Sequence, residues 1–162
     1  MSVNAGDRSQ SKLEVLYQAT KLNDALTNLC LRSFGIYSKN SPFRQKYMIV
    51  TKYDPYKTDL VDRMIEDKIH IVCNLSSKVV ELVNAANAIY PRSSEEFKLR
   101  VSYQNESLAT CEMIEQELNG IARVFDVDIN YFKEAVEVLC LERHLILEWR
   151  KSDKFRFKRY SL

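Results

Sequence analysis

The sequence predicts an all-α protein, more specifically an antiparallel up-down-up-down four-helix bundle with a basic, aromatic connection inserted between its first and second helices. Only 3 Gly and 3 Pro occur among the 162 residues, so turns are few and the elements between them must be long. Apolar residues recur at three- and four-residue spacing along four segments, which is the period of an amphipathic helix. Long helices joined by short turns favour antiparallel neighbours, so a bundle is the economical way to bury their apolar faces.

The first helix is expected over residues 11–34. Ser11 is a suitable N-cap, and Gly35 is a suitable C-terminal stop. Apolar side chains that recur along one face of this stretch are Leu22, Ala25, Leu26, Leu29, Cys30 and Phe34. Residues 1–10 are small and polar, and we expect them to form a disordered leader.

The other three helices are expected over residues 58–90, 93–124 and 129–151. Pro91 ends the first of these, because the residue before a proline is pushed out of helical angles. Ser93 is a suitable cap for the next, since Glu96 follows three residues later. Together with the first helix, they form the predicted bundle of residues 11–151.

The connection over residues 36–58, here called the insert, differs in composition from the helices. It contains two of the three prolines, five cations and one acid. Its five aromatic residues are Tyr37, Phe43, Tyr47, Tyr53 and Tyr56. A short helix or strand is expected near residues 45–51. Long connections in compact domains are often functional, so we take Tyr47 and Tyr53 as candidate docking groups for a partner.

The cysteines and the hydropathy indicate a cytoplasmic protein. The four cysteines are far apart in sequence, and we expect four buried thiols in a reducing compartment. No Cys-x-x-Cys spacing typical of a zinc site occurs. No run approaches the roughly 18 apolar residues of a membrane span, and the polar first residues do not resemble a signal peptide.

No constellation of catalytic residues is found, so we expect no enzymatic activity, no metal and no cofactor. The chain has no Gly-x-Ser-x-Gly motif and too few glycines for a phosphate-binding loop. A di-metal site in a bundle would need Glu-x-x-His on two helices. The residue three positions before His144 is Leu141, and the one three positions before His70 is Asp67. An enzyme with a buried metal is the least favoured of the hypotheses.

The end of the fourth helix and the tail of residues 152–162 are strongly basic. We call residues 150–159 the basic segment; its six cations are opposed by one acid and are Arg150, Lys151, Lys154, Arg156, Lys158 and Arg159. Phe155 and Phe157 alternate with these cations and are candidate stacking or docking groups. Cations neutralise phosphates and aromatic rings stack on bases, so the pattern fits nucleic acid. It equally fits a solubilising helix end, where cations suit the dipole, and it also fits an acidic protein partner.

The fourth helix predicts an oligomer. Leucines lie on almost every side of it, which exceeds what one bundle needs, and a large exposed apolar patch usually marks an interface. Trp149 belongs either to the core of the bundle or to such an interface.

Several motifs resemble one known family. The third helix opens with Glu96-Phe97-x-x-Arg100-x-x-Tyr103-Gln104-x-Glu106, and the fourth closes with Trp149-Arg150-Lys151-Ser152-Asp153. With Cys111-x-x-x-Glu115-x-Glu117-Leu118 and Val127-Asp128-x-Asn130 between them, they resemble the four-helix-bundle proteins of the 23S rRNA intervening-sequence type. Within that group the chain is most similar to the accessory variability determinant proteins of diversity-generating retroelements.

The resemblance implies a non-enzymatic accessory protein that forms a homopentamer with a positive surface. Such proteins bind a reverse transcriptase and its RNA or DNA, and they support mutagenic reverse transcription. Matched basic positions are Arg100, Arg150 and Lys151. The insert and the small net charge of +2 depart from the family pattern. The alternative is a protein–protein interaction bundle of the same family with no nucleic-acid role.

Overall fold

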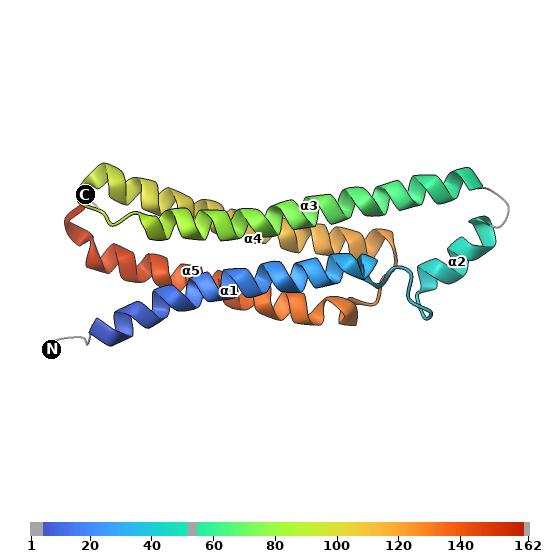
Figure 1. Ribbon diagram of the computed structural model, residues 1–162, viewed down its shortest axis with the longest axis horizontal. Helices are drawn as coiled ribbons and strands as arrows, with labels where there is room; N and C mark the ends of the chain where they lie inside the picture. Colours follow the sequence, from blue (N-terminus) through green and yellow to red (C-terminus); the bar gives the residue numbers. More distant parts are fainter. Residues whose placement is uncertain (1–4, 52–54, 161–162) are drawn as a thin grey trace.

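The computed structural model describes the backbone of residues 5–51 and 55–160 and the side chains of residues 14–46 and 57–160. Every secondary-structure element in this part of the chain is helical, which confirms the all-α prediction. The long helices lie along the long axis of the molecule (Figure 1) and are α1 (Ala5–Leu31), α3 (Pro55–Ala88), α4 (Ser94–Val124) and α5 (Lys133–Arg156).

The long helices pack on one another in a closed set of neighbours: α1 contacts α3 and α5, and α4 contacts α3 and α5. Two ion pairs define the relative direction of α3 and α4. Lys68 pairs with Glu117, and Lys78, further along α3, pairs with Glu106, earlier on α4. These two helices are therefore antiparallel.

The structure has a fifth α-helix, α2 (Pro42–Thr51), in the part of the insert where a short helix or strand was expected near residues 45–51. Pro42 suits the first position of a helix, where its missing N–H would have no intrahelical acceptor. The Ser41 hydroxyl accepts a hydrogen bond from the Arg44 N–H at 3.4 Å. The ring of Phe43 packs edge-on against Phe125, with 5.3 Å between centroids.

The turn after α1 contains the short 3-10 helix η1 (Ser33–Gly35). Phe34 and Gly35 adopt φ values of 56° and 76°, in the left-handed region that favours glycine. A Cβ atom on Gly35 would lie 2.8 Å from the ring of Tyr131. Gly35 is thus required both for its backbone angle and for the close approach of this ring.

The helix boundaries differ most from the prediction at the two ends of the chain. Helix α1 begins at Ala5, whereas a cap at Ser11 was expected. Residues such as Arg8 and Gln10 have good helix propensity, so a helix formed downstream extends through them. Residues 1–4 lie outside the described part, and the division into leader, bundle and tail stays a prediction.

At the other end, α5 continues to Arg156, five residues past the predicted end at residue 151. Two 3-10 helices flank it, η2 (Ile129–Phe132) and η3 (Lys158–Tyr160). Asp128 caps η2 by accepting a hydrogen bond from the Asn130 N–H at 2.9 Å.

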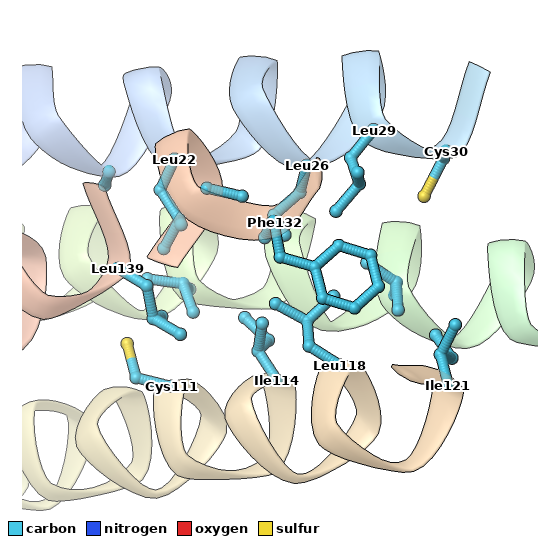
Figure 2. Packing of buried hydrophobic residues seen from close by; sticks show 14 of the residues in the cluster. Leu22, Leu26, Leu29, Cys30, Cys111, Ile114, Leu118, Ile121, Phe132 and Leu139 are labelled. Carbon is cyan, nitrogen blue, oxygen red and sulfur yellow. The ribbon is translucent and has the colours of Figure 1, made fainter. Parts of the chain in front are cut away.

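The core is built from the apolar stripes that the sequence shows. Figure 2 shows the leucines of α1 and the side chains of α4 pointing toward each other, with Phe132 and Leu139 between them. Leu22, Leu26 and Leu29 are at most 2% exposed. Burying each such side chain stabilises the fold by roughly 1.5–3 kcal/mol.

The prediction of four buried thiols is correct only for Cys30 and Cys111. Cys73 is half-buried and Cys140 is exposed. Cys140 follows the buried Leu139, and successive residues on a helix are about 100° apart, so the thiol turns away from the core. Among the described residues, none of the helices has the length and apolar character needed to cross a membrane.

Candidate functional site

A buried ionic network joins α3, α4 and α5 at the end of the molecule where α5 terminates. Arg100 of α4 and Asp153 of α5 are 0% and 2% exposed. The Arg100 Nε and Nη2 groups donate to the two carboxylate oxygens of Asp153 at 2.6 and 3.1 Å. Gln104 Nε2 donates to the same carboxylate at 2.7 Å. This bidentate geometry is the strongest form of an arginine–carboxylate pair.

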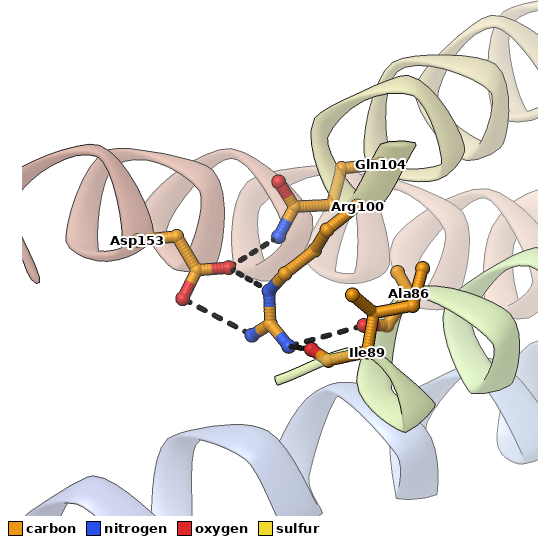
Figure 3. A network of polar contacts seen from close by, with 5 residues as sticks. All are labelled: Ala86, Ile89, Arg100, Gln104 and Asp153. Carbon is orange, nitrogen blue, oxygen red and sulfur yellow. Dashed lines mark hydrogen bonds and ion pairs between the residues drawn. The ribbon is translucent and has the colours of Figure 1, made fainter. Parts of the chain in front are cut away.

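The remaining nitrogen of the Arg100 guanidinium caps the end of α3. Nη1 donates to the carbonyl oxygens of Ala86 at 3.0 Å and Ile89 at 2.6 Å. Figure 3 shows the guanidinium between these carbonyls and Asp153. The last carbonyls of a helix have no intrahelical donor, so Arg100 satisfies groups that burial would otherwise leave unpaired. We call Arg100, Gln104, Asp153 and these two carbonyls the Arg100–Asp153 network.

Aromatic rings surround the Arg100 guanidinium. Its central carbon lies 4.8 Å from the ring centre of Trp149 and 5.9 Å from that of Phe157. The Phe157 ring packs against Tyr90 and Phe97, with centroids 5.6 and 6.0 Å apart. Trp149 is 5% exposed, so of its two predicted locations it takes the core.

Two of the predicted contact residues are therefore corrected. The resemblance implies Arg100 as a surface contact for nucleic acid, but its guanidinium is buried and hydrogen-bonded on all three nitrogens. Phe157 was taken as a docking group, yet it is 3% exposed and packs in the core. Neither side chain is accessible to a ligand at the surface of the protein.

The basic segment is consequently part of the folded bundle. The Phe157 N–H donates to the Asp153 carbonyl at 2.8 Å, which continues the helical pattern past the expected end. The carbonyl of Tyr160 accepts a hydrogen bond from the Ser94 hydroxyl at the start of α4, at 3.1 Å. The cations of this segment are thus attached to a packed scaffold.

Three of the predicted cations line one hollow between α4 and α5. This basic groove has a volume of about 410 Å³ and is lined by Phe97, Val101, Asn105, Arg150, Lys151 and Lys154. An adjoining hollow of about 260 Å³ shares its α4 residues and adds Lys98, Ser102 and Tyr160. The groove therefore combines an apolar floor with a cationic wall, a lining suited to an anion that also has an apolar part.

Neighbouring groups position two of these cations. Arg150 donates to the side-chain oxygen of Asn105 across the groove. Lys151 donates to Glu148 at 2.6 Å, and this hydrogen bond lowers the pKa of the Glu148 carboxyl. Part of the Lys151 charge is thereby neutralised, whereas no acidic partner pairs with Lys154 among the described residues.

The other predicted cations do not line the groove, and all three are exposed. Arg156 is exposed, with its guanidinium 5.4 Å from the ring centre of Tyr90. Arg159 is exposed and lies 4.7 Å from the ring centre of Tyr160, and Lys158 is exposed as well. Phe155, the remaining aromatic of the basic segment, is 86% exposed.

The candidate residues of the insert lie outside the part of the structure whose side chains are described. Tyr47 belongs to α2, but its side chain lies outside the described part of the structure, and Tyr53 lies outside the described residues altogether. The described part of the insert contacts α3, where the Tyr37 hydroxyl donates to the Asp62 carboxylate, and the region at the end of α4. Lys46 pairs with Asp126 there at 3.7 Å, and both side chains are exposed.

One buried acid has no partner. Glu142 of α5 is 0% exposed, and neither carboxylate oxygen has a hydrogen-bond partner among the described residues. Burial raises the pKa of this carboxyl to about 8. Burial also raises the pKa of the Cys111 thiol, beside the Glu142 carboxyl, to about 12. No group of three or more potential metal ligands occurs in the described part of the chain.

Two features of the sequence indicate that Gln104 and Asp153 are buried polar groups, although their burial was not predicted. Gln104 interrupts the apolar face of the third predicted helix, and Asp153 is the only acid of the basic segment. Buried polar groups need partners, so a polar residue on an apolar face indicates a second one facing it. Glu142 offered no comparable signal, because it lies in a helix with several solvent-facing acids.

The comparisons with known proteins gave no relatives: the chain matches no family model, no curated protein and no solved structure.

Proposed function

We propose that this chain is a non-enzymatic accessory protein that binds nucleic acid through the basic groove. The observation that supports this most directly is the placement of Arg150, Lys151 and Lys154 on one wall of a groove whose α5 wall is fixed by buried Asp153. Because the backbone of α5 is already ordered, only the side chains of these cations lose conformational entropy when they neutralise phosphates. The scaffold in this proposal is an antiparallel up-down-up-down bundle of α1, α3, α4 and α5.

The resemblance to the accessory proteins of diversity-generating retroelements supports a more specific role. In this role the chain is a cytoplasmic, bacterial homo-oligomer, a pentamer, that brings a reverse transcriptase and its RNA or DNA together during mutagenic reverse transcription. The basic groove supplies the nucleic-acid contact, and another surface of the oligomer contacts the enzyme. The proposal includes no catalytic residue and no cofactor.

Binding of a fluorescent structured RNA at low salt tests the nucleic-acid contact. The variant Arg150→Ala/Lys151→Ala/Lys154→Ala removes three cations from the groove. The matched control Lys21→Ala/Arg63→Ala/Lys133→Ala removes three exposed cations that do not line the groove, from α1, α3 and the first turn of α5. We expect the groove variant to lose most of the affinity and the control to keep it. Equal affinities of the two variants, or no binding by the wild type, would contradict the proposal.

A second candidate function is a protein-interaction module with no nucleic-acid role. Leu60, Met64 and Ile71 of α3 are 52%, 42% and 38% exposed, and their spacing places them on one side of the helix. Such a stripe fits a partner protein. Binding to a purified reverse transcriptase that persists at high salt, without any RNA affinity, would favour this candidate, because phosphate contacts weaken steeply as salt rises.

A further inference from the structure

The exposed ring of Phe155 is the feature of the basic segment that phosphate binding alone does not explain. Its side chain is 86% exposed, more than any other large apolar side chain of the described residues. Large aromatic side chains usually contribute to cores or interfaces. A polar residue would serve equally well at a position that only faces water.

Helix geometry explains why this ring points outward. Asp153 and Phe157 are both buried, and positions two apart on a helix differ by about 200°. Phe155 lies between them and must therefore face away from the core. Asp153 is held by the Arg100–Asp153 network, and Phe157 packs against Tyr90 and Phe97. The turn of α5 that carries the Phe155 ring is therefore fixed.

The ring is adjacent to the cations of the basic groove. Lys151 lies one turn before Phe155 on the same side of α5, since residues four apart are neighbours on a helix surface. Lys154 and Arg156 flank it in sequence, and both are exposed. An outward ring next to cations matches the surfaces on which proteins hold single strands, where bases stack on rings while cations contact the backbone.

We propose that the basic groove takes single-stranded nucleic acid and that one base of the strand stacks on Phe155. This inference rests on the nucleic-acid binding proposed above and adds the form of the ligand. In a duplex the bases are stacked on one another, so their faces are closed to a side chain, whereas unpaired bases are free to stack on aromatic rings. The phosphates of the strand lie along Arg150, Lys151 and Lys154.

The test compares a short single-stranded RNA with a duplex RNA of the same length, for the wild type and for Phe155→Ala. Loss of one stacking contact weakens binding by about fivefold or more. We expect this loss for the single strand and no change for the duplex. Phe155→Tyr keeps a ring and should retain the affinity, and Tyr17→Ala, which removes an exposed ring from α1, serves as the matched control.

A 2-aminopurine base in the strand reports on stacking directly, because its fluorescence is quenched when it stacks. Quenching by the wild type and by Phe155→Tyr, but not by Phe155→Ala, would support the inference. Equal effects of Phe155→Ala on strand and duplex, or none on the strand, would overturn it while the phosphate contact stands. Failure of the wild type to bind either RNA would overturn the proposed function itself.

Discussion

The basic segment and the insert have similar compositions but are attached to the bundle by different contacts. Both are rich in cations and aromatic residues. In the basic segment, Asp153 and Phe157 are buried and join α5 to α3 and α4. In the insert, the Lys46–Asp126 pair is exposed on both sides, and Phe43 is only half-buried.

The difference shows that the contacts of a basic segment with the bundle, more than its charge, decide whether the backbone that carries its cations is held in one position. An exposed ion pair such as Lys46–Asp126 contributes about 0–1 kcal/mol. Removing one member of a buried pair costs about 3–5 kcal/mol, because the other charge is left without a partner. The Arg100–Asp153 network therefore fixes the cations of α5 on the surface of the bundle.

The largest effect is expected for Asp153→Ala. This change leaves the buried Arg100 guanidinium without its carboxylate and should lower the free energy of unfolding by about 3–5 kcal/mol, measured by urea denaturation. Lys46→Ala removes the cation of the insert's ion pair with Asp126 and should lower it by less than about 1 kcal/mol. Similar losses for the two variants would show that the two segments are attached alike.

A somewhat smaller effect is expected for Phe157→Ala. The ring is buried against Tyr90 and Phe97, and truncating a buried phenylalanine costs about 3 kcal/mol. The control Phe43→Ala should cost less than half of this, because Phe43 is half-buried. Thermal denaturation of both variants gives the comparison. A Phe43→Ala variant that is the less stable of the two would contradict it.

A third prediction concerns the pH dependence of stability and the buried carboxyl of Glu142. The pKa of Glu142 is raised from 4.5 to about 8, so between these values the folded state keeps a proton that the unfolded state has lost. Stability should fall as pH rises through this interval, by at most about 1.4 kcal/mol per pH unit. Above about pH 8 the fall should end.

The variant Glu142→Gln should remove this part of the pH dependence, and the difference in unfolding free energy from the wild type at several pH values measures it. The exposed Glu137→Gln serves as control. A wild type and a Glu142→Gln variant with parallel pH profiles would show that Glu142 titrates alike in both states.

The parts of the fold that the sequence predicted are those set by local patterns. The helix expected over residues 93–124 is observed as Ser94–Val124, because its Ser93 cap accepts a hydrogen bond from the Glu96 N–H only three residues away. The helical insert was ambiguous, since a short apolar run fits a helix or a strand.

The candidate site was predicted less well, because its burial depends on contacts between distant residues. Arg100 and Asp153 are 53 residues apart, and no local pattern pairs them. The resemblance implied that Arg100 is a surface contact, and an arginine is usually exposed. Arg150, Lys151 and Lys154 were predicted as cations of one segment, but only the packing of α4 against α5 shows that they line one groove.

The most direct test of the central claim is the salt dependence of RNA binding when three cations are removed from either basic region. One variant is Arg150→Ala/Lys151→Ala/Lys154→Ala, and the other, in the insert, is Lys39→Ala/Arg44→Ala/Lys46→Ala. Each phosphate contact contributes about 0.7–0.9 to the slope of log affinity against log salt concentration. We predict that the groove variant loses about 2–3 from this slope while the insert variant keeps the wild-type value. A loss in the insert variant, with a wild-type slope in the groove variant, would contradict the account.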